Sequence, residues 1–146
     1  MRAVIQRVTA ARVRVDGEAI AEIGPGLLVL LGVALGDGAA EVAWMVRKLA
    51  EIRIFADESG KMNRSLLEAG GSVLLVSQFT LFGDAEQGRR PSFVGAAPPA
   101  AAAPLVDQVA LGLRDRGLPV ATGRFGAMME VELTNAGPVT LILDTP

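Results

Sequence analysis

Residues able to do chemistry gather at the end of one apolar run. The stretch 73–76 is entirely apolar, and Ser77, Gln78 and Thr80 then supply a hydroxyl, an amide and a second hydroxyl. The run predicts a buried strand, and because side chains alternate between the two faces of a strand, Gln78 and Thr80 would share one face. Such a pair could position a polar substrate. The alternative is a strand that simply enters a polar loop, with Thr80 present for its β-propensity.

The composition limits which chemistry is available. The chain has no Cys and no His, so thiolate nucleophiles, thiolate metal sites, disulfides and the Ser-His-Asp arrangement are excluded. A Thr80 nucleophile would need an activating base that the sequence does not offer. We therefore expect catalysis to use carboxylates, hydroxyls, backbone groups or the substrate itself, and we predict no metal and no other cofactor. The acidic residues Asp57 and Glu58 lack the ligand spacing of an EF-hand and indicate a solvated loop.

Length and net charge limit the class of protein. The 146 residues predict a single domain, 1–146, and the net charge of −2 argues against broad non-specific binding to nucleic acid. We expect no DNA partner. Arg89 and Arg90 lie in a loop flanked by Gly and Pro, where their planar guanidinium groups could bind phosphate; the alternative is that Arg merely replaces Lys in a GC-rich genome. The apolar run 26–35 is too short to span a bilayer, and the N-terminus lacks the apolar block of a secretory signal. We expect a cytoplasmic protein without a membrane partner.

The order of predicted elements indicates the α+β class, with two packed α-helices on a largely antiparallel, curled, barrel-like sheet. Asp16-Gly17 is a strong hairpin signal, and the run 27–34 is apolar at every position, which is typical of a strand covered on both faces. Helices are expected at about 38–52, with Asp37 as N-cap, and at about 99–116, where Pro104 is tolerable only in the first turn. Strands are expected at 2–8, 12–15, 18–23, 27–34, 54–56, 73–82, 120–122, 127–134 and 139–143, with a turn at 135–138 between the last two.

Two motifs together resemble a known family. Ser77-Gln-Phe-Thr80 and Asn135-Ala-Gly-Pro-Val-Thr140 are similar to the two signature motifs of the D-aminoacyl-tRNA deacylases, also called D-tyrosyl-tRNA(Tyr) deacylases. The likeness covers nearly the whole chain in order. It extends through Met1-Arg-Ala-Val-Ile-Gln-Arg-Val8, Gly24-Pro-Gly-Leu-Leu-Val-Leu-Leu-Gly32, Gly88-Arg-Arg-Pro-Ser-Phe93 and Thr122-Gly-Arg-Phe-Gly-Ala127.

The resemblance implies a homodimer that selects its substrate by chirality. Each Gly137-Pro138 turn, with its peptide bond in cis, would insert into the active site of the partner chain. Its carbonyl groups would contact the amino group of the ligand and leave no room for an L side chain. D-amino acids would then fit, L-amino acids would clash and glycine would pass. The resemblance also implies that Arg7 helps to hold this turn, although an ordinary surface role for Arg7 is an equal alternative.

The implied reaction is hydrolysis of the ester that joins an amino acid to the terminal ribose of tRNA. The resemblance places Ser77, Gln78, Phe79 and Thr80 in the catalytic site. We expect backbone N–H groups near Phe79 and Thr80 to form an oxyanion hole, with the ribose 2′-hydroxyl or a water completing the chemistry. A Thr80 nucleophile is the second possibility, and a non-catalytic dimeric module that binds tRNA ends or an amino acid is the alternative to an enzyme.

Further contacts with the tRNA end are expected from four residues. Phe125 and Met129 are candidates for packing on the terminal adenine, since single-stranded RNA ends are bound by stacking. Core packing is the competing interpretation of Met129. Arg89 and Arg90 are the candidate phosphate contacts.

Overall fold

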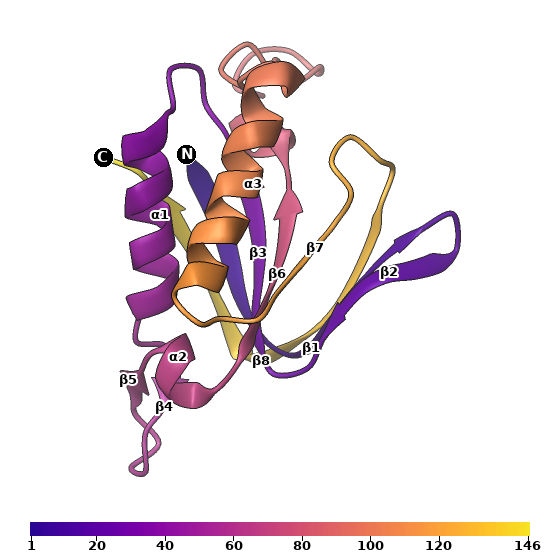
Figure 1. Ribbon diagram of the computed structural model, residues 1–146. Helices are drawn as coiled ribbons and strands as arrows, with labels where there is room; N and C mark the ends of the chain where they lie inside the picture. Colours follow the sequence, from indigo (N-terminus) through magenta and orange to yellow (C-terminus); the bar gives the residue numbers. More distant parts are fainter.

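The first and last strands of the chain pair with each other in the computed structural model, which describes residues 1–146 (Figure 1). Strand β1 (Arg2–Val15) pairs along one edge with β8 (Glu130–Asp144). Its other edge pairs with β3 (Gly26–Gly32) and then with β2 (Glu18–Ile23). All three of these pairings are antiparallel.

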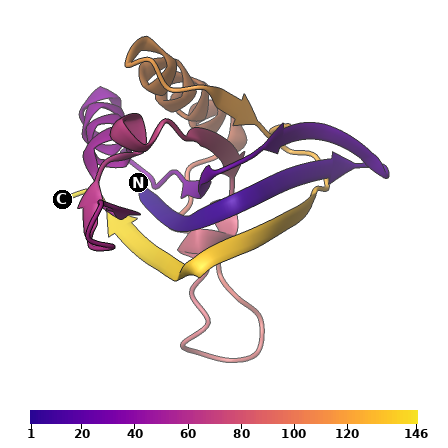
Figure 2. The ribbon, with the colours of Figure 1, turned by 90° about the horizontal axis from the view of Figure 1, so that it is seen from below.

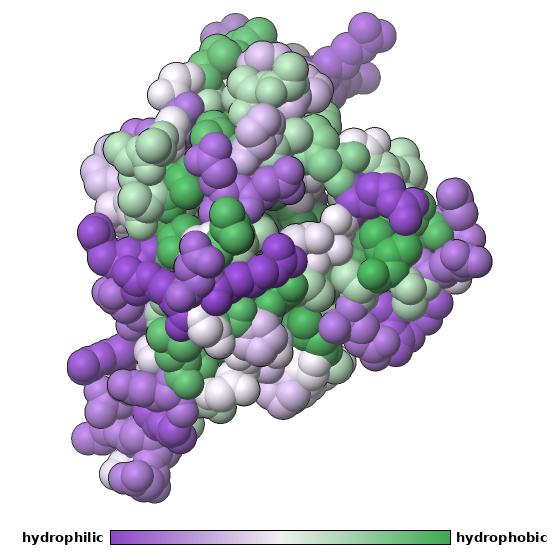
Figure 3. Space-filling view, in the orientation of Figure 1, coloured by the Kyte–Doolittle hydropathy of each residue, from purple (hydrophilic) through white to green (hydrophobic).

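The sheet continues from β3 with parallel strands. The strand β6 (Ser72–Ser77) pairs with β3, and β7 (Val120–Thr122) pairs with β6. The small strands β4 (Phe55–Ala56) and β5 (Met62–Arg64) form a separate hairpin, which is covered by hydrophilic residues at the lower left of Figure 3. The sheet is therefore mixed, and Figure 2 shows how β1, β2 and β8 curl away from the helices. The expected α+β fold with a curled, barrel-like sheet is confirmed.

Two long helices cover one face of the sheet, as expected (Figure 1). They are α1 (Ala39–Glu51) and α3 (Pro99–Asp115). The sequence reasoning missed the short helix α2 (Leu66–Ala69), whose N-cap Ser65 and Glu68 form a capping box. None of the helices is long and apolar enough to cross a membrane.

The apolar strands β3 and β6 are buried on both faces, as the continuous run predicted. The side facing the helices contributes Leu27, Val29, Leu31, Val73 and Leu75 to the main core. The opposite side is covered by the curled part of the sheet rather than by helices. It forms a second core of Val8, Ala11, Val13, Ile23, Leu28, Leu74 and Val76.

Two expectations about helix ends are wrong. The N-cap of α1 is Gly38, whose N–H donates to the Glu41 carboxylate over 2.7 Å. Asp37 instead accepts from the N–H of Ala34 over 2.7 Å, so its carboxylate closes the preceding turn. Pro104 lies in the second turn of α3, not the first, and its ring is exposed at the helix surface.

The expected boundaries of the long strands also need correction. Residues 2–15 are one strand, not two, and residues 130–144 are one strand, with 127–129 outside it. Residues 135–138 therefore do not turn between two strands. They lie where the β1–β8 register slips: Gln6 pairs with Thr140 and Val8 with Asn135, which leaves four residues of β8 opposite Arg7. The Gly-Pro segment is thus a large bulge within a continuous strand.

Candidate active site

A pocket of about 700 Å³ lies at the end of β6. Its walls are mostly apolar and come from β3, the segment 93–99, the start of α3 and the segment 125–131. The pocket brings together six of the predicted site residues, which are Ser77, Gln78, Phe79, Thr80, Phe125 and Met129. None of the lining residues carries an ionisable side chain.

The polar residues of the pocket leave the strand sooner than expected. The strand β6 ends at Ser77, and a 3₁₀ turn, η1 (Phe79–Phe82), follows. The expected strand alternation over Gln78 and Thr80 is therefore wrong. Their side chains still meet, because the Gln78 amide Nε2 donates to Thr80 Oγ1, and the N–H of Gln78 donates to the carbonyl of Leu31 over 2.8 Å, which ties the turn to β3.

The start of η1 presents two free backbone donors. The N–H groups of Phe79 and Thr80 have no acceptor within the chain, as is general for the first residues of a helical turn. The turn is closed behind them by the N–H of Gly83, which donates to the carbonyl of Thr80 over 2.9 Å. Two adjacent donors at an apolar pocket can stabilise an oxygen that gains negative charge.

Aromatic and thioether side chains form the rim of the pocket. Phe79 packs against Phe93 in an edge-to-face arrangement with ring centroids 5.2 Å apart. Phe125 lines the pocket and is exposed, whereas Met129 is half-buried and also packs against the second core. Met128, which is 90% exposed, lines the pocket as well. Sequence reasoning missed Met128 and gave no role to Phe93, because only the folded loop places Phe93 against Phe79.

The Gly137-Pro138 bulge lies outside this pocket. Its peptide bond is cis and both residues are exposed. Arg7 contacts it from β1: Arg7 Nε donates to the carbonyl of Ala136 over 2.9 Å, and Nη1 donates to the carbonyl of Ile54 over 2.6 Å. Within one chain, the structure does not bring Gly137 and Pro138 to the residues of η1.

A second residue braces the bulge from within β8. The side chain of Asn135 accepts from the N–H of Val139 over 2.7 Å, and its amide nitrogen donates to the carbonyl of Val139 and to Thr140 Oγ1. One side chain therefore closes the loop of backbone that carries Gly137 and Pro138. The sequence motif contained Asn135 and Thr140, but neither residue had a predicted function of its own.

Comparison with known proteins decides the family. Residues 4–144 match the family model described as D-Tyr-tRNA(Tyr) deacylase. The chain belongs to this deacylase family. It is 59% identical over 145 residues to the D-aminoacyl-tRNA deacylase of Roseiflexus sp. (strain RS-1), covering 99% of this chain and 94% of that protein. It is 58% identical over 146 residues to that of Myxococcus xanthus (strain DK1622), covering 100% and 95% of the two chains.

Solved structures share the fold of this deacylase-family chain. The structure of a protein named c-Myc DNA Unwinding Element Binding Protein superimposes with a TM-score of 0.94 at 43% identity, covering 100% of this chain and 99% of that one. The structure of a probable eukaryotic D-amino acid tRNA deacylase gives a TM-score of 0.83 at 21% identity, covering 99% and 98%. The second likeness supports the fold alone.

Two basic residues of the deacylase-family chain lie near the pocket without lining it. Arg89 and Arg90 are exposed and form no hydrogen bond or ion pair. They belong to a loop that Asp84 and Ser92 close by two backbone hydrogen bonds of 2.8 Å. Figure 2 shows the loop projecting from the body of the molecule.

Arg2 holds η1 from the side away from the pocket. Arg2 Nη1 donates to the carbonyl of Leu81 over 3.2 Å, and the guanidinium lies over the Phe82 ring at 5.5 Å. The Phe82 ring packs closely against Gly32, since a Cβ on Gly32 would lie only 3.0 Å from the ring. The sequence offered no signal for this contact because Arg2 and Leu81 are far apart along the chain.

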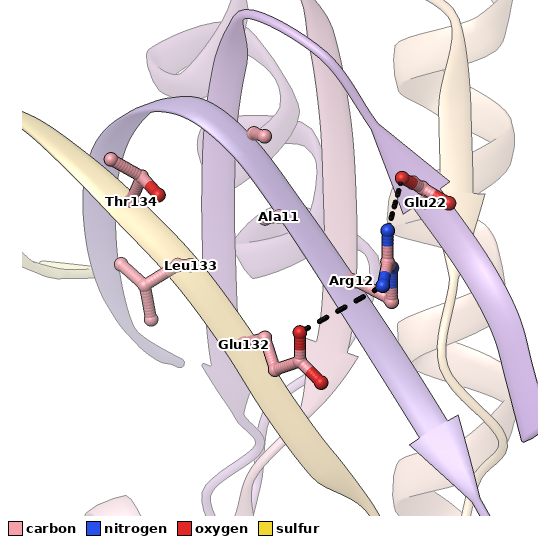
Figure 4. Close-up of a pocket in the computed structure, with 7 residues that line it drawn as sticks. Ala11, Arg12, Glu22, Glu132, Leu133 and Thr134 are labelled. Carbon is pink, nitrogen blue, oxygen red and sulfur yellow. Dashed lines mark hydrogen bonds and ion pairs between the residues drawn. The ribbon is translucent and has the colours of Figure 1, made fainter. Parts of the chain in front are cut away.

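A second, shallower hollow of about 180 Å³ lies on β1, β2 and β8, and its charges neutralise one another (Figure 4). Arg12 pairs with Glu22 at 2.8 Å and lies 3.9 Å from Glu132, which Arg14 contacts at 2.6 Å. The hydrogen bond from Arg14 holds the pKa of the Glu132 carboxyl below its usual value. This arrangement leaves no free charge to bind a ligand, so the apolar pocket is the candidate active site of this deacylase-family chain.

Proposed function

We propose that this chain hydrolyses the ester bond of D-aminoacyl-tRNA and of glycyl-tRNA, and spares L-aminoacyl-tRNA. The observation that carries the proposal is the pair of free N–H groups of Phe79 and Thr80 in an apolar pocket. These donors suit the oxyanion of an ester under attack, and the pocket offers no ionisable group for another reaction class. The relatives align with 99–100% of this chain, and their names support the same substrate class.

In the proposed mechanism, the ester carbonyl oxygen accepts from the N–H groups of Phe79 and Thr80. A water attacks the carbonyl carbon, and the negative charge moves to that oxygen. The intermediate then collapses, the bond to the ribose 3′ oxygen breaks, and the proton lost by water passes through the 2′-hydroxyl to that leaving oxygen. The products are the free amino acid and tRNA with an intact 3′ end.

Thr80 and Gln78 position the substrate in this mechanism. The Thr80 hydroxyl accepts from the Gln78 amide, and an amide is no base, so nothing near Thr80 can remove its proton. The free hydroxyl proton of Thr80 remains available as a donor to the substrate. These contacts favour a positioning role over a covalent one.

Chirality is read, in our proposal, by a second copy of the chain. The Gly137-Pro138 bulge is exposed, is held by Arg7 and Asn135, and lies outside its own pocket. Inserted into the pocket of a partner, its carbonyl oxygens would accept from the α-amino group, and its backbone would occupy the space of an L side chain. A homodimer then has two composite sites.

The remaining contacts concern the tRNA end. We propose that Phe125 and Met129 pack on the terminal adenine and that Arg89 and Arg90 contact phosphates. The 43% identical protein of known structure carries a DNA element in its name. For this chain we propose tRNA alone, because the relatives that match 99–100% of its length are named for aminoacyl-tRNA.

The deciding measurement is deacylation of matched D- and L-aminoacyl-tRNA at equal enzyme concentration. We expect rapid release with the D substrate and none with the L substrate. Equal rates would contradict chiral selection, and binding without release would favour the non-catalytic module.

The composite site has its own test. A variant with a defective pocket, Gln78→Ala with Thr80→Ala, is mixed with the bulge variant Gly137→Ala after unfolding and joint refolding. A mixed dimer would contain one composite site in which the pocket and the bulge are both intact, so the D-selective activity of the mixture should exceed the mean of the two parent dimers. A mixture that forms dimers and shows only this mean would indicate that the bulge does not act across subunits.

A further inference from the structure

We propose a second nucleotide subsite beside the pocket, in which the base preceding the terminal adenosine stacks on Phe93 while Arg89 or Arg90 contacts the phosphate that joins this nucleotide to the adenosine. This inference rests on the proposed function, because it extends the same substrate by one nucleotide. It assigns a ligand to an aromatic residue and a loop that the reaction itself does not need.

Phe93 is exposed and yet held in place. The residue is 38% exposed, although its ring packs against Phe79 and lies so close to Gly83 that a Cβ there would come within 2.9 Å of the ring. The backbone beside it is fixed by the two hydrogen bonds between Asp84 and Ser92. A ring fixed in position without being covered is suited to stacking with a base, since stacking requires little further ordering.

The charges near Phe93 fit a phosphate. Arg2, Arg12, Arg14 and Arg116 are ion-paired, whereas Arg89 and Arg90 have no partner. The two acidic residues of the loop do not neutralise them: Asp84 accepts from the N–H of Glu86, and neither carboxylate forms an ion pair. An aromatic ring on the same loop as unpaired arginines is a combination by which proteins bind single-stranded nucleic acid.

Continuity with the pocket identifies the nucleotide. Phe93 lines the same cavity as Phe79 and Thr80, where the ester and its adenosine are placed by the proposed function. Arg89 and Arg90 lie on the adjoining loop, outside the cavity. The nucleotide that enters this region next is the one attached to the adenosine through its 5′ phosphate.

The test compares two small substrates that differ by one nucleotide. These are D-aminoacyl-adenosine and the D-aminoacyl ester of the dinucleotide CpA, each with the same amino acid. We expect kcat/KM to be at least tenfold higher for the dinucleotide, because stacking and one phosphate contact are gained. Phe93→Leu keeps an apolar contact with Phe79 but removes the ring, so the ratio of kcat/KM for the dinucleotide to that for the adenosine substrate should fall to about one. Val94→Ala, at the exposed neighbouring position, is the matched control and should behave as the wild type.

Two results would overturn the subsite. Equal use of both substrates by the wild type would show that no second nucleotide is bound. An equal loss on both substrates in Phe93→Leu would show that Phe93 acts through Phe79 on the terminal nucleoside. If D-aminoacyl-tRNA is not hydrolysed at all, the proposed function fails, and the subsite is tested by the binding affinities of unacylated CpA and adenosine. Tighter binding of CpA than of adenosine, lost in Phe93→Leu, would support the subsite. Equal affinities of the wild type for the two ligands would overturn it.

Discussion

Arg2 lies opposite Asp144 in the pairing of β1 with β8, and Arg2 Nε donates to Asp144 Oδ1 over 2.8 Å. The same guanidinium donates to the carbonyl of Leu81 and covers the Phe82 ring. An exposed ion pair therefore connects the end of the last strand to the turn that presents the backbone donors of the candidate active site.

This connection predicts that Arg2→Met lowers kcat without unfolding the protein. The pair is 41% and 53% exposed on its two side chains, and such pairs contribute about 0–1 kcal/mol to stability. A displaced turn, in contrast, would misplace both donors, which can cost about tenfold to a hundredfold in rate. We expect Tm to change by no more than about 4 °C and KM to stay constant, whereas Asp144→Asn, which keeps an acceptor, should be nearly normal. A loss of activity that merely follows a loss of stability would contradict a positioning role for Arg2.

The proposed mechanism predicts different effects for Thr80 and for the substrate hydroxyl. Thr80→Ala removes one donor and leaves the Gln78 amide without its acceptor, so we expect less than a tenfold loss of kcat. Replacing the terminal 2′-hydroxyl by hydrogen should reduce the single-turnover rate at least a hundredfold. The opposite pattern would make Thr80 the nucleophile.

Gly137→Ala should weaken the choice between D and L substrates. A Cβ at this position would lie 2.8 Å from Val139 Cγ2 and 3.2 Å from Arg7 Nη2, at a backbone φ of +144° that favours glycine. The bulge must shift, so we expect the ratio of D to L deacylation rates to fall at least tenfold. Gly24→Ala is the matched control, since a Cβ there meets nothing within 4 Å. An unchanged ratio in Gly137→Ala would exclude the bulge as the selector.

The pH dependence of the reaction should contain no ionisation of the protein between about pH 5 and 9. No ionisable side chain lines the pocket, and bell-shaped profiles report an essential acid and base of the enzyme. Single-turnover rates across this range should therefore show only the ionisation of the substrate amine, which the uncatalysed hydrolysis shows independently. An inflection that moves when a carboxylate of the chain is replaced would disprove this prediction.

Acid stability should depend on Glu132. The hydrogen bond from Arg14, and then the charges of Arg14 and Arg12, lower the pKa of the Glu132 carboxyl below its usual 4.5. A carboxyl with a lowered pKa in the folded state stabilises the fold above its usual pKa, and this contribution is lost as the pH falls through the folded-state value. Glu132→Gln should therefore lower Tm at pH 7 and have a smaller effect at pH 3. Glu130→Gln, at an exposed position without an ion pair, is the control; the same curve for both variants would contradict the assignment.

The elements that the sequence predicted well are those fixed by neighbouring residues. The Asp16-Gly17 signal gives a hairpin because both residues adopt the positive φ that the turn requires, 51° and 81°. The apolar stripe of α1 is buried as its spacing predicted, and the all-apolar run of β3 is covered on both faces.

The parts that could not be predicted depend on distant partners. The sequence around Gly137-Pro138 resembles a turn. Only the pairing of β1 with β8 on both sides of this segment shows that β8 continues through it. The 3₁₀ turn after Ser77 and the contact of Phe79 with Phe93 likewise depend on the loop that Asp84 and Ser92 close. The two signature motifs located the candidate site, but the geometry of its donors came only from the fold.

The pairing of β1 with β8 also has a consequence for how a nascent chain folds. β2 and β3 are synthesised soon after β1 and can pair with one of its edges, whereas the partner of the other edge is the last strand, with Arg2 opposite Asp144. Contacts between such distant segments form slowly, because a long loop must close first. On the ribosome, one edge of β1 therefore stays open to wrong partners until β8 has been synthesised, and the Gly137-Pro138 bulge forms only when β8 pairs with β1.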